Sequence, residues 1–98
     1  MTNKELHSLI ETVPHEVLTC GNIECTFEEV SYTRNRIDIN FFLKDSHIFI
    51  CYIRVFGNHT IESAYFEDDK EKPEYKDGFI AMQQTKAYLE ILGFQCIN

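Results

Sequence analysis

Hydrophobic and polar positions alternate along most of the chain between residues 23 and 67. A period of two is typical of half-buried β-strands, in which successive side chains point to opposite faces of the sheet. We therefore expect one face of a sheet to enter a hydrophobic core. The residues predicted on that face are Ile23, Cys25, Phe27, Ile37, Ile39, Phe41, Phe49, Cys51, Ile53 and Val55.

Turn-forming residues divide this stretch into separate strands. Gly21-Asn22 suits a tight two-residue turn, which predicts that Glu16–Cys20 is the hairpin partner of the first strand. Connections this short favour an antiparallel meander over parallel crossovers. A short edge strand is also expected over residues 95–97, giving four or five strands in all. The four main strands are predicted over Ile23–Tyr32, Ile37–Lys44, His47–Phe56 and Thr60–Glu67.

The N-terminal residues predict a short helix. Thr2 and Glu5 have the spacing of a capping box, in which each side chain accepts a hydrogen bond from the backbone N–H of the other residue. Apolar residues then recur at helical spacing as far as Pro14, which should end the helix near residues 11–12.

A second helix is predicted over Gly78–Leu92, with Asp77 as its N-cap and Gly93 just after its end. Each helix has one apolar stripe, so both should pack on the aliphatic face of the sheet. The predicted fold class is therefore α+β: an N-terminal helix, an antiparallel meander and a C-terminal helix, in one domain spanning residues 1–98. The stripe of the second helix is expected to contain Ala81, Tyr88, Ile91 and Leu92.

The opposite face of the sheet mixes carboxylates with large aromatic side chains. A solvated sheet face is usually plainly polar, so this mixture indicates a surface that another molecule covers. The alternative is that a helix or a chain terminus of this protein covers it. The predicted partner-binding residues on this face are Glu24, Glu28, Asp38, Phe42, Tyr52, Phe56, Glu62 and Phe66.

An acidic segment continues this face along residues 67–77. Such a run is usually a solvated connection. A functional interpretation is that Glu67, Asp68 and Asp69 extend the negative field of the face, so that it imitates a phosphate backbone.

Composition narrows the choice of partner. With 16 acidic and 9 basic residues the net charge is −7, which disfavours direct binding to nucleic acid or anionic lipid and favours a basic protein partner.

The N-terminus lacks the apolar segment of a signal peptide and no apolar run is long enough to span a membrane, so we expect a cytoplasmic protein with four free cysteines.

No set of residues in the sequence strongly indicates a catalytic or metal-binding site. Metal ligands lack zinc-type spacing, and His47 and Cys51 lie about 13 Å apart along one strand. Cys20 with His15 is the best candidate for an activated thiol, but nothing in the sequence brings the two together. Paired carboxylates on a flat sheet lack a pocket, and no glycine-rich phosphate loop is present. We therefore predict no enzyme activity, metal or cofactor.

Small size, acidity and the lack of a catalytic motif are typical of phage-encoded inhibitors and toxin-immunity proteins, classes that are defined by role. The leading interpretation is a small inhibitory protein that blocks a basic, nucleic-acid-acting partner such as a nuclease, in part as a DNA mimic. One alternative is a structural or adaptor module that forms a homodimer through its open sheet face. A small-ligand binder or enzyme is the other.

Overall fold

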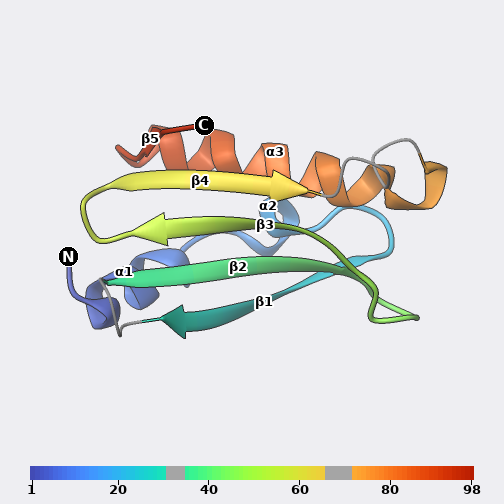
Figure 1. Ribbon diagram of the computed structural model, residues 1–98, viewed down its shortest axis with the longest axis horizontal. Coiled ribbons are helices and arrows are strands. Elements are labelled where there is room, and N and C mark those ends of the chain that lie inside the picture. Colours follow the sequence, from blue (N-terminus) through green and yellow to red (C-terminus); the bar gives the residue numbers. More distant parts are fainter. Residues whose placement is uncertain (31–34, 66–71) are drawn as a thin grey trace.

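The computed structural model describes residues 1–30, 35–65 and 72–98, and it has the predicted α+β fold (Figure 1). Short helices begin the chain, four strands follow, and a long helix leads to a last short strand. The elements are α1 (Asn3–Ile10), α2 (His15–Leu18), β1 (Ile23–Val30), β2 (Arg36–Leu43), β3 (Phe49–Phe56), β4 (Thr60–Tyr65), a 3-10 turn (Pro73–Tyr75), α3 (Lys76–Ile91) and β5 (Gln95–Cys96).

The strands lie in the order β1-β2-β3-β4-β5, and each of the first three pairs is antiparallel. The predicted meander is thus confirmed. The fifth strand pairs parallel to β4, so the sheet is mixed. Its direction follows from α3, which carries the chain back along the sheet before β5 begins, as a crossover between parallel strands requires.

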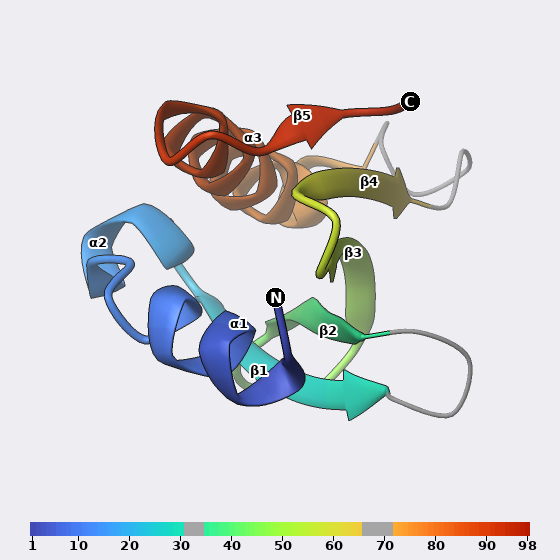
Figure 2. The ribbon, with the colours of Figure 1, turned by 90° about the vertical axis from the view of Figure 1, so that its left-hand side faces the viewer.

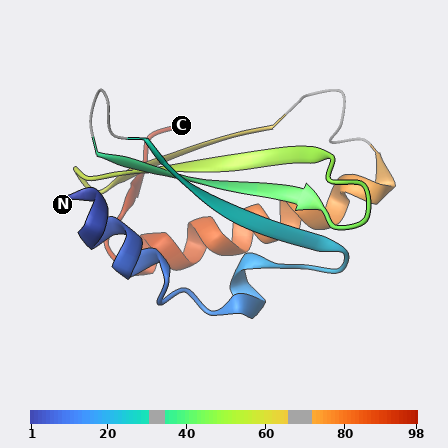
Figure 3. The ribbon, with the colours of Figure 1, turned by 90° about the horizontal axis from the view of Figure 1, so that it is seen from below.

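The helices pack on one face of the sheet, as predicted (Figures 2 and 3). Between them and the sheet lies a single hydrophobic core, to which α1 contributes Leu6 and Ile10 and β2 contributes Ile37, Ile39 and Phe41. The capping box of α1 is confirmed, because Glu5 N donates to Thr2 Oγ1 and Thr2 N donates to Glu5 Oε1. We call the opposite surface of the sheet the outer face.

The predicted strand over Glu16–Cys20 is wrong, because most of this segment forms the helical turn α2. Pro14 begins the turn as its N-cap, and its carbonyl accepts hydrogen bonds from Val17 and Leu18. Proline is well suited to the start of a helix because its φ angle is already helical. Leu18 is buried there, so the turn supplies the core with an apolar side chain that a hairpin strand would have placed elsewhere.

The helix α3 starts at Lys76, with Tyr75 in the N-cap position, so Asp77 lies in the first turn and is not the cap. The predicted stripe is also partly wrong: Ala81 is buried, but Ile91 is 82% exposed. The face of α3 that meets the core consists of Gly78, Ala81, Met82, Thr85 and Leu89. Because this row includes a glycine and a threonine, the spacing of large apolar residues does not reveal it.

The C-terminal end of α3 is a Schellman motif, with Gly93 just after the helix as predicted. Phe94 N donates to Leu89 O and Gly93 N donates to Glu90 O, both at 3.0 Å. Gly93 has φ of +102°, a conformation that glycine adopts at little cost. Phe94 turns back into the core, where it is 3% exposed.

A β-bulge in β3 changes which side chains face the core. Phe41 pairs with Cys51 but the next residue, Phe42, pairs with Phe49, so Ile50 is an extra residue in β3. Ile50 and Cys51 are both fully buried. Phe49, predicted as a core residue, is only half-buried, and its ring meets that of Phe42 on the outer face.

Candidate functional site

The outer face is organised in rows that run across the strands. One row joins Glu28, Asp38, Arg54 and Glu62 on β1, β2, β3 and β4, each residue directly opposite the next. Side chains directly opposite one another in a sheet are close enough to interact. The register therefore produces a charged row across the middle of the outer face.

Beside the charged row lies an aromatic cluster, which we define as Phe42, Phe49 and Tyr52. The ring centroids of Phe42 and Phe49 are 5.7 Å apart in an edge-to-face arrangement, and those of Phe49 and Tyr52 are 6.0 Å apart and stacked. All three side chains are half-buried. The β3 bulge assembles the cluster, because it turns Phe49 toward the same face as Phe42 and Tyr52.

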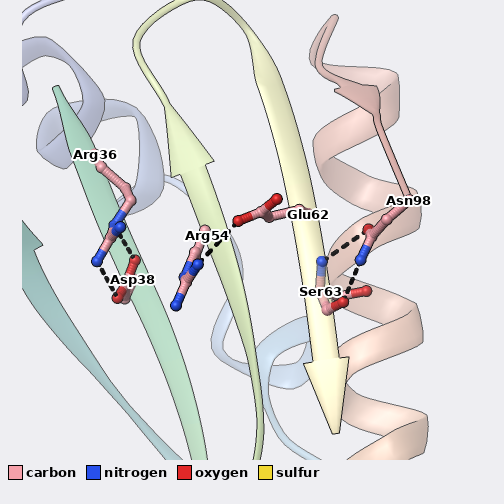
Figure 4. A network of polar contacts seen from close by, with 6 residues as sticks. All are labelled: Arg36, Asp38, Arg54, Glu62, Ser63 and Asn98. Atoms are coloured by element: carbon pink, nitrogen blue, oxygen red, sulfur yellow. Dashed lines mark hydrogen bonds and ion pairs between the residues drawn. The ribbon is translucent and has the colours of Figure 1, made fainter. Parts of the chain in front are cut away.

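Two arginines hold carboxylates of the charged row, and one of them, Arg54, also joins the row to the aromatic cluster. The guanidinium carbon of Arg54 lies 4.9 Å from the ring centroid of Tyr52, and its Nη1 donates to Glu62 Oε1 at 3.1 Å. Arg36 holds Asp38 through two contacts, Nε to Oδ1 at 2.9 Å and Nη2 to Oδ2 at 3.2 Å (Figure 4). Two of the predicted carboxylates are thus engaged in ion pairs within the chain.

Asp38 is the most buried carboxylate of the row, with a side chain that is 13% exposed. Burial raises the pKa of its carboxyl, and the nearby Arg36 and Arg54 offset that effect only in part. Because Asp38 is buried and paired with Arg36, it presents little negative charge to a partner.

Sequence parity placed Arg36 and Arg54 on the outer face, but the prediction counted only the acids there. Four predicted carboxylates and these two arginines leave a net charge of −2 on the face, against −7 for the whole chain. Phe49 was not predicted on the outer face for another reason. A one-residue bulge reverses the face to which the preceding residues of a strand point, and no residue in the sequence indicates this bulge.

The remaining predicted residues have different surroundings. Glu24 lies 3.3 Å from the exposed His47 at one margin of the aromatic cluster, and Glu28 is exposed at the β1 end of the charged row. Phe56 has the outward parity but is only 1% exposed, so it offers no surface to a partner. Four predicted residues lie outside the described residues: Phe66, Glu67, Asp68 and Asp69.

The candidate nucleophile Cys20 lies beside a carboxylate. Its thiol donates to Asp77 Oδ1 at 3.6 Å, and desolvation and then the charge of Asp77 raise its pKa. An activated cysteine needs a lowered pKa, so this environment works against nucleophilic chemistry. Within residues 1–30, 35–65 and 72–98, no group of three or more potential ligand side chains is placed to hold a metal ion.

Among the described helices, none combines the length and apolar character needed to cross a membrane. Comparison of the chain with protein-family models, with curated proteins and with solved structures gives no match.

Proposed function

We propose that this chain is a small protein-binding domain that holds a basic protein partner against the outer face of its sheet. The observation that carries the proposal is the aromatic cluster of Phe42, Phe49 and Tyr52, which α1, α2 and α3 leave uncovered because they all pack on the other face (Figure 2). Aromatic side chains bordered by charged groups are typical of the energetic centre of protein interfaces.

Charge supports a basic partner more than it supports phosphate mimicry. The whole chain carries −7, which speeds the approach of a basic protein. On the face itself, however, Asp38 and Glu62 are neutralised by Arg36 and Arg54. We infer that the aromatic cluster provides affinity, whereas the overall field provides the association rate.

An inhibitory role follows if the partner acts on nucleic acid. The basic surface of such a partner is its substrate-binding surface, so an acidic domain bound there blocks access of the substrate. The mechanism is steric and electrostatic occlusion. The DNA-mimic contribution comes from the net field of the chain, and not from a row of free carboxylates.

The test compares two variants that place a lysine on opposite sides of the molecule. Tyr52→Lys disrupts the aromatic cluster, whereas Ile91→Lys changes a side chain on α3 that is 82% exposed. Partners are captured with each protein, identified, purified and titrated at low and physiological salt. We expect Tyr52→Lys to weaken binding at least about tenfold, as for a central interface residue, and Ile91→Lys to leave it unchanged.

A nucleic-acid-binding assay of the purified partner then tests inhibition. Wild-type chain should displace the nucleic acid and Tyr52→Lys should not. Equal binding by wild type and a folded Tyr52→Lys would overturn the proposal. Sedimentation that shows a wild-type dimer and a Tyr52→Lys monomer, with no other partner, would establish the homodimer instead.

A further inference from the structure

The two edges of the sheet differ in how they are closed. At the β4 edge, β5 pairs with Thr60 and Ile61, and the side-chain amide of Asn98 then bonds to both the N–H and the C=O of Ser63 (Figure 4). At the other edge, β1 pairs with β2 alone within the part of the chain that the structure describes (Figure 1). The β1 edge is thus the open one.

Register shows which backbone groups of β1 face outward. Asn22 O accepts a hydrogen bond from Lys44 N at 2.9 Å, and the pairing from Ile23 to Val30 continues without a shift. Hydrogen-bonded and non-bonded pairs alternate in an antiparallel ladder, so the even-numbered residues of β1 bond to β2. The N–H and C=O groups that point to the open edge are those of Ile23, Cys25, Phe27 and Glu29.

A groove of about 400 Å³ lies along the first half of this edge. It is lined by Glu24 and by Cys25, which belong to opposite faces of β1, so the groove extends around the edge of the strand. On the helix side its wall includes Leu18 and Phe27. A strand added to β1 would therefore place every second side chain into a hollow beneath the sheet, where Leu18, Cys25 and Phe27 offer apolar contacts beside the polar His15 and Thr19.

On the outer face the same edge is acidic. Glu24 and Glu28 project from β1 there, and among the described residues no side chain forms an ion pair with Glu28. A second copy of β1 would bring like charges together, which disfavours pairing between two copies of this chain. The β1 strand also lacks proline, lysine and a bulge, which commonly prevent edge pairing.

We propose that the β1 edge binds an extended segment of a protein partner, which adds to the sheet as an antiparallel strand with alternating basic and apolar side chains. The basic side chains meet Glu24 and Glu28, and the apolar ones enter the groove beside Cys25 and Phe27. Main-chain hydrogen bonds to β1 supply the affinity, as in other cases of strand addition. The inference rests on the proposed function only for the basic character of the partner.

The experiment uses a capped synthetic peptide of eight residues that alternates lysine and valine, titrated into the full chain by calorimetry. In the antiparallel geometry the valines lie opposite Cys25 and Phe27, so it is the valine N–H groups that bond to β1. A peptide N-methylated at its valines should bind at least about tenfold more weakly, because several hydrogen bonds are lost. A peptide N-methylated at its lysines should keep its affinity.

Protein variants test the charges. Glu24→Gln with Glu28→Gln should weaken binding of the unmethylated peptide roughly fivefold and reduce its salt dependence. The control, Glu16→Gln with Glu90→Gln, removes the same charge from exposed positions of α2 and α3 and should have no effect. Chemical-shift changes confined to β1 would place the peptide at the edge.

Equal affinities for the two N-methylated peptides, or no binding of the unmethylated one, would overturn the proposal. The reverse pattern, with loss only on lysine methylation, would overturn the antiparallel geometry. Because this assay contains no natural partner, its result is independent of whether the aromatic cluster binds one.

Discussion

A Cβ atom on Gly78 would lie 2.9 Å from Cδ1 of Ile50 and 3.0 Å from its Cγ2. The first turn of α3 therefore rests directly on the bulge of β3. Alanine at this position would normally favour a helix by about 1 kcal/mol. Here two branches of a fully buried isoleucine obstruct it, and we expect Gly78→Ala to lower the free energy of unfolding by about 1–2 kcal/mol. Urea denaturation measures the change.

A double-mutant cycle tests the cause of that loss. Ile50→Val removes Cδ1 and should cost about 1 kcal/mol by itself, but it should reduce the penalty of Gly78→Ala. Gln83→Ala, at an exposed position of the same helix, serves as the control and should change stability little. Strict additivity of Gly78→Ala and Ile50→Val would show that the two residues do not obstruct each other.

The contact between Gly78 and Ile50 lies where two elements depart from simple sequence patterns. Alternation in β2 and in most of β3 was predicted correctly, because a side chain such as Ile39 or Ile53 stabilises the fold only when it lies on the buried face. The bulge at Ile50 could not be predicted, since the alternation of β3 continues through it without a residue that marks the shift. Gly78 likewise lies on the buried face of α3 although it has no apolar side chain to mark it.

The candidate site was predictable to a similar extent. Parity placed Asp38, Phe42 and Tyr52 on the outer face, which the register confirms. The aromatic cluster needed Phe49, which only the bulge brings to that face. The pairing of Arg54 with Glu62 required knowledge of the β3–β4 register, which local sequence patterns do not determine.

Thr85 links α3 to α2 through a buried hydroxyl. Its Oγ1 lies 2.8 Å from Ala81 O and 3.2 Å from Val17 O, so its single hydrogen is shared between the two carbonyls. Thr85→Val keeps the shape but removes the donor, which leaves the carbonyl of Val17 without this bond. We expect a loss of about 1–2 kcal/mol in the free energy of unfolding.

The control for Thr85→Val is the same substitution at Thr12, whose hydroxyl donates to Leu9 O in an exposed setting. There water can replace the lost bond, so stability should change by less than about 0.5 kcal/mol. Denaturation of both variants in urea provides the comparison. Equal losses for Thr12→Val and Thr85→Val would contradict a special role for the buried hydroxyl.

Cys51 should be the least reactive of the four cysteines in the native protein. It is fully buried and its thiol donates to Gly78 O at 3.5 Å. Burial raises its pKa from 9.0 to about 12, so near pH 8 its thiolate fraction is roughly 1,000-fold smaller than that of an ordinary thiol. Alkylation followed by mass spectrometry should therefore modify Cys51 last.

Denaturant provides the control for this experiment, because unfolding exposes all four thiols and should equalise their rates. In the native protein, modification of Cys51 should then follow the rate of unfolding or local opening. Alkylation of Cys51 as fast as that of the half-buried Cys96 would show that the core beneath α3 opens readily.

The charged row predicts a distinct dependence of stability on pH. Burial raises the pKa of Asp38 above its ordinary value of 3.8 despite the adjacent Arg36 and Arg54. A carboxyl whose pKa is raised by folding stabilises the folded state most when it is protonated. This contribution is complete at a pH below the pKa of the same group in the unfolded chain. That contribution is lost as the pH rises through the folded-state pKa.

Asp38→Asn removes the titration of this group but keeps an oxygen that can accept a hydrogen bond from Arg36. We therefore expect the difference in unfolding free energy, variant minus wild type, to increase as the pH is raised from about 3 to about 7. Urea denaturation across this range measures the difference, and NMR titration of the Asp38 carboxyl carbon measures the pKa directly. A difference that decreases with pH would mean that the ion pair with Arg36 outweighs burial, with the pKa lowered instead of raised.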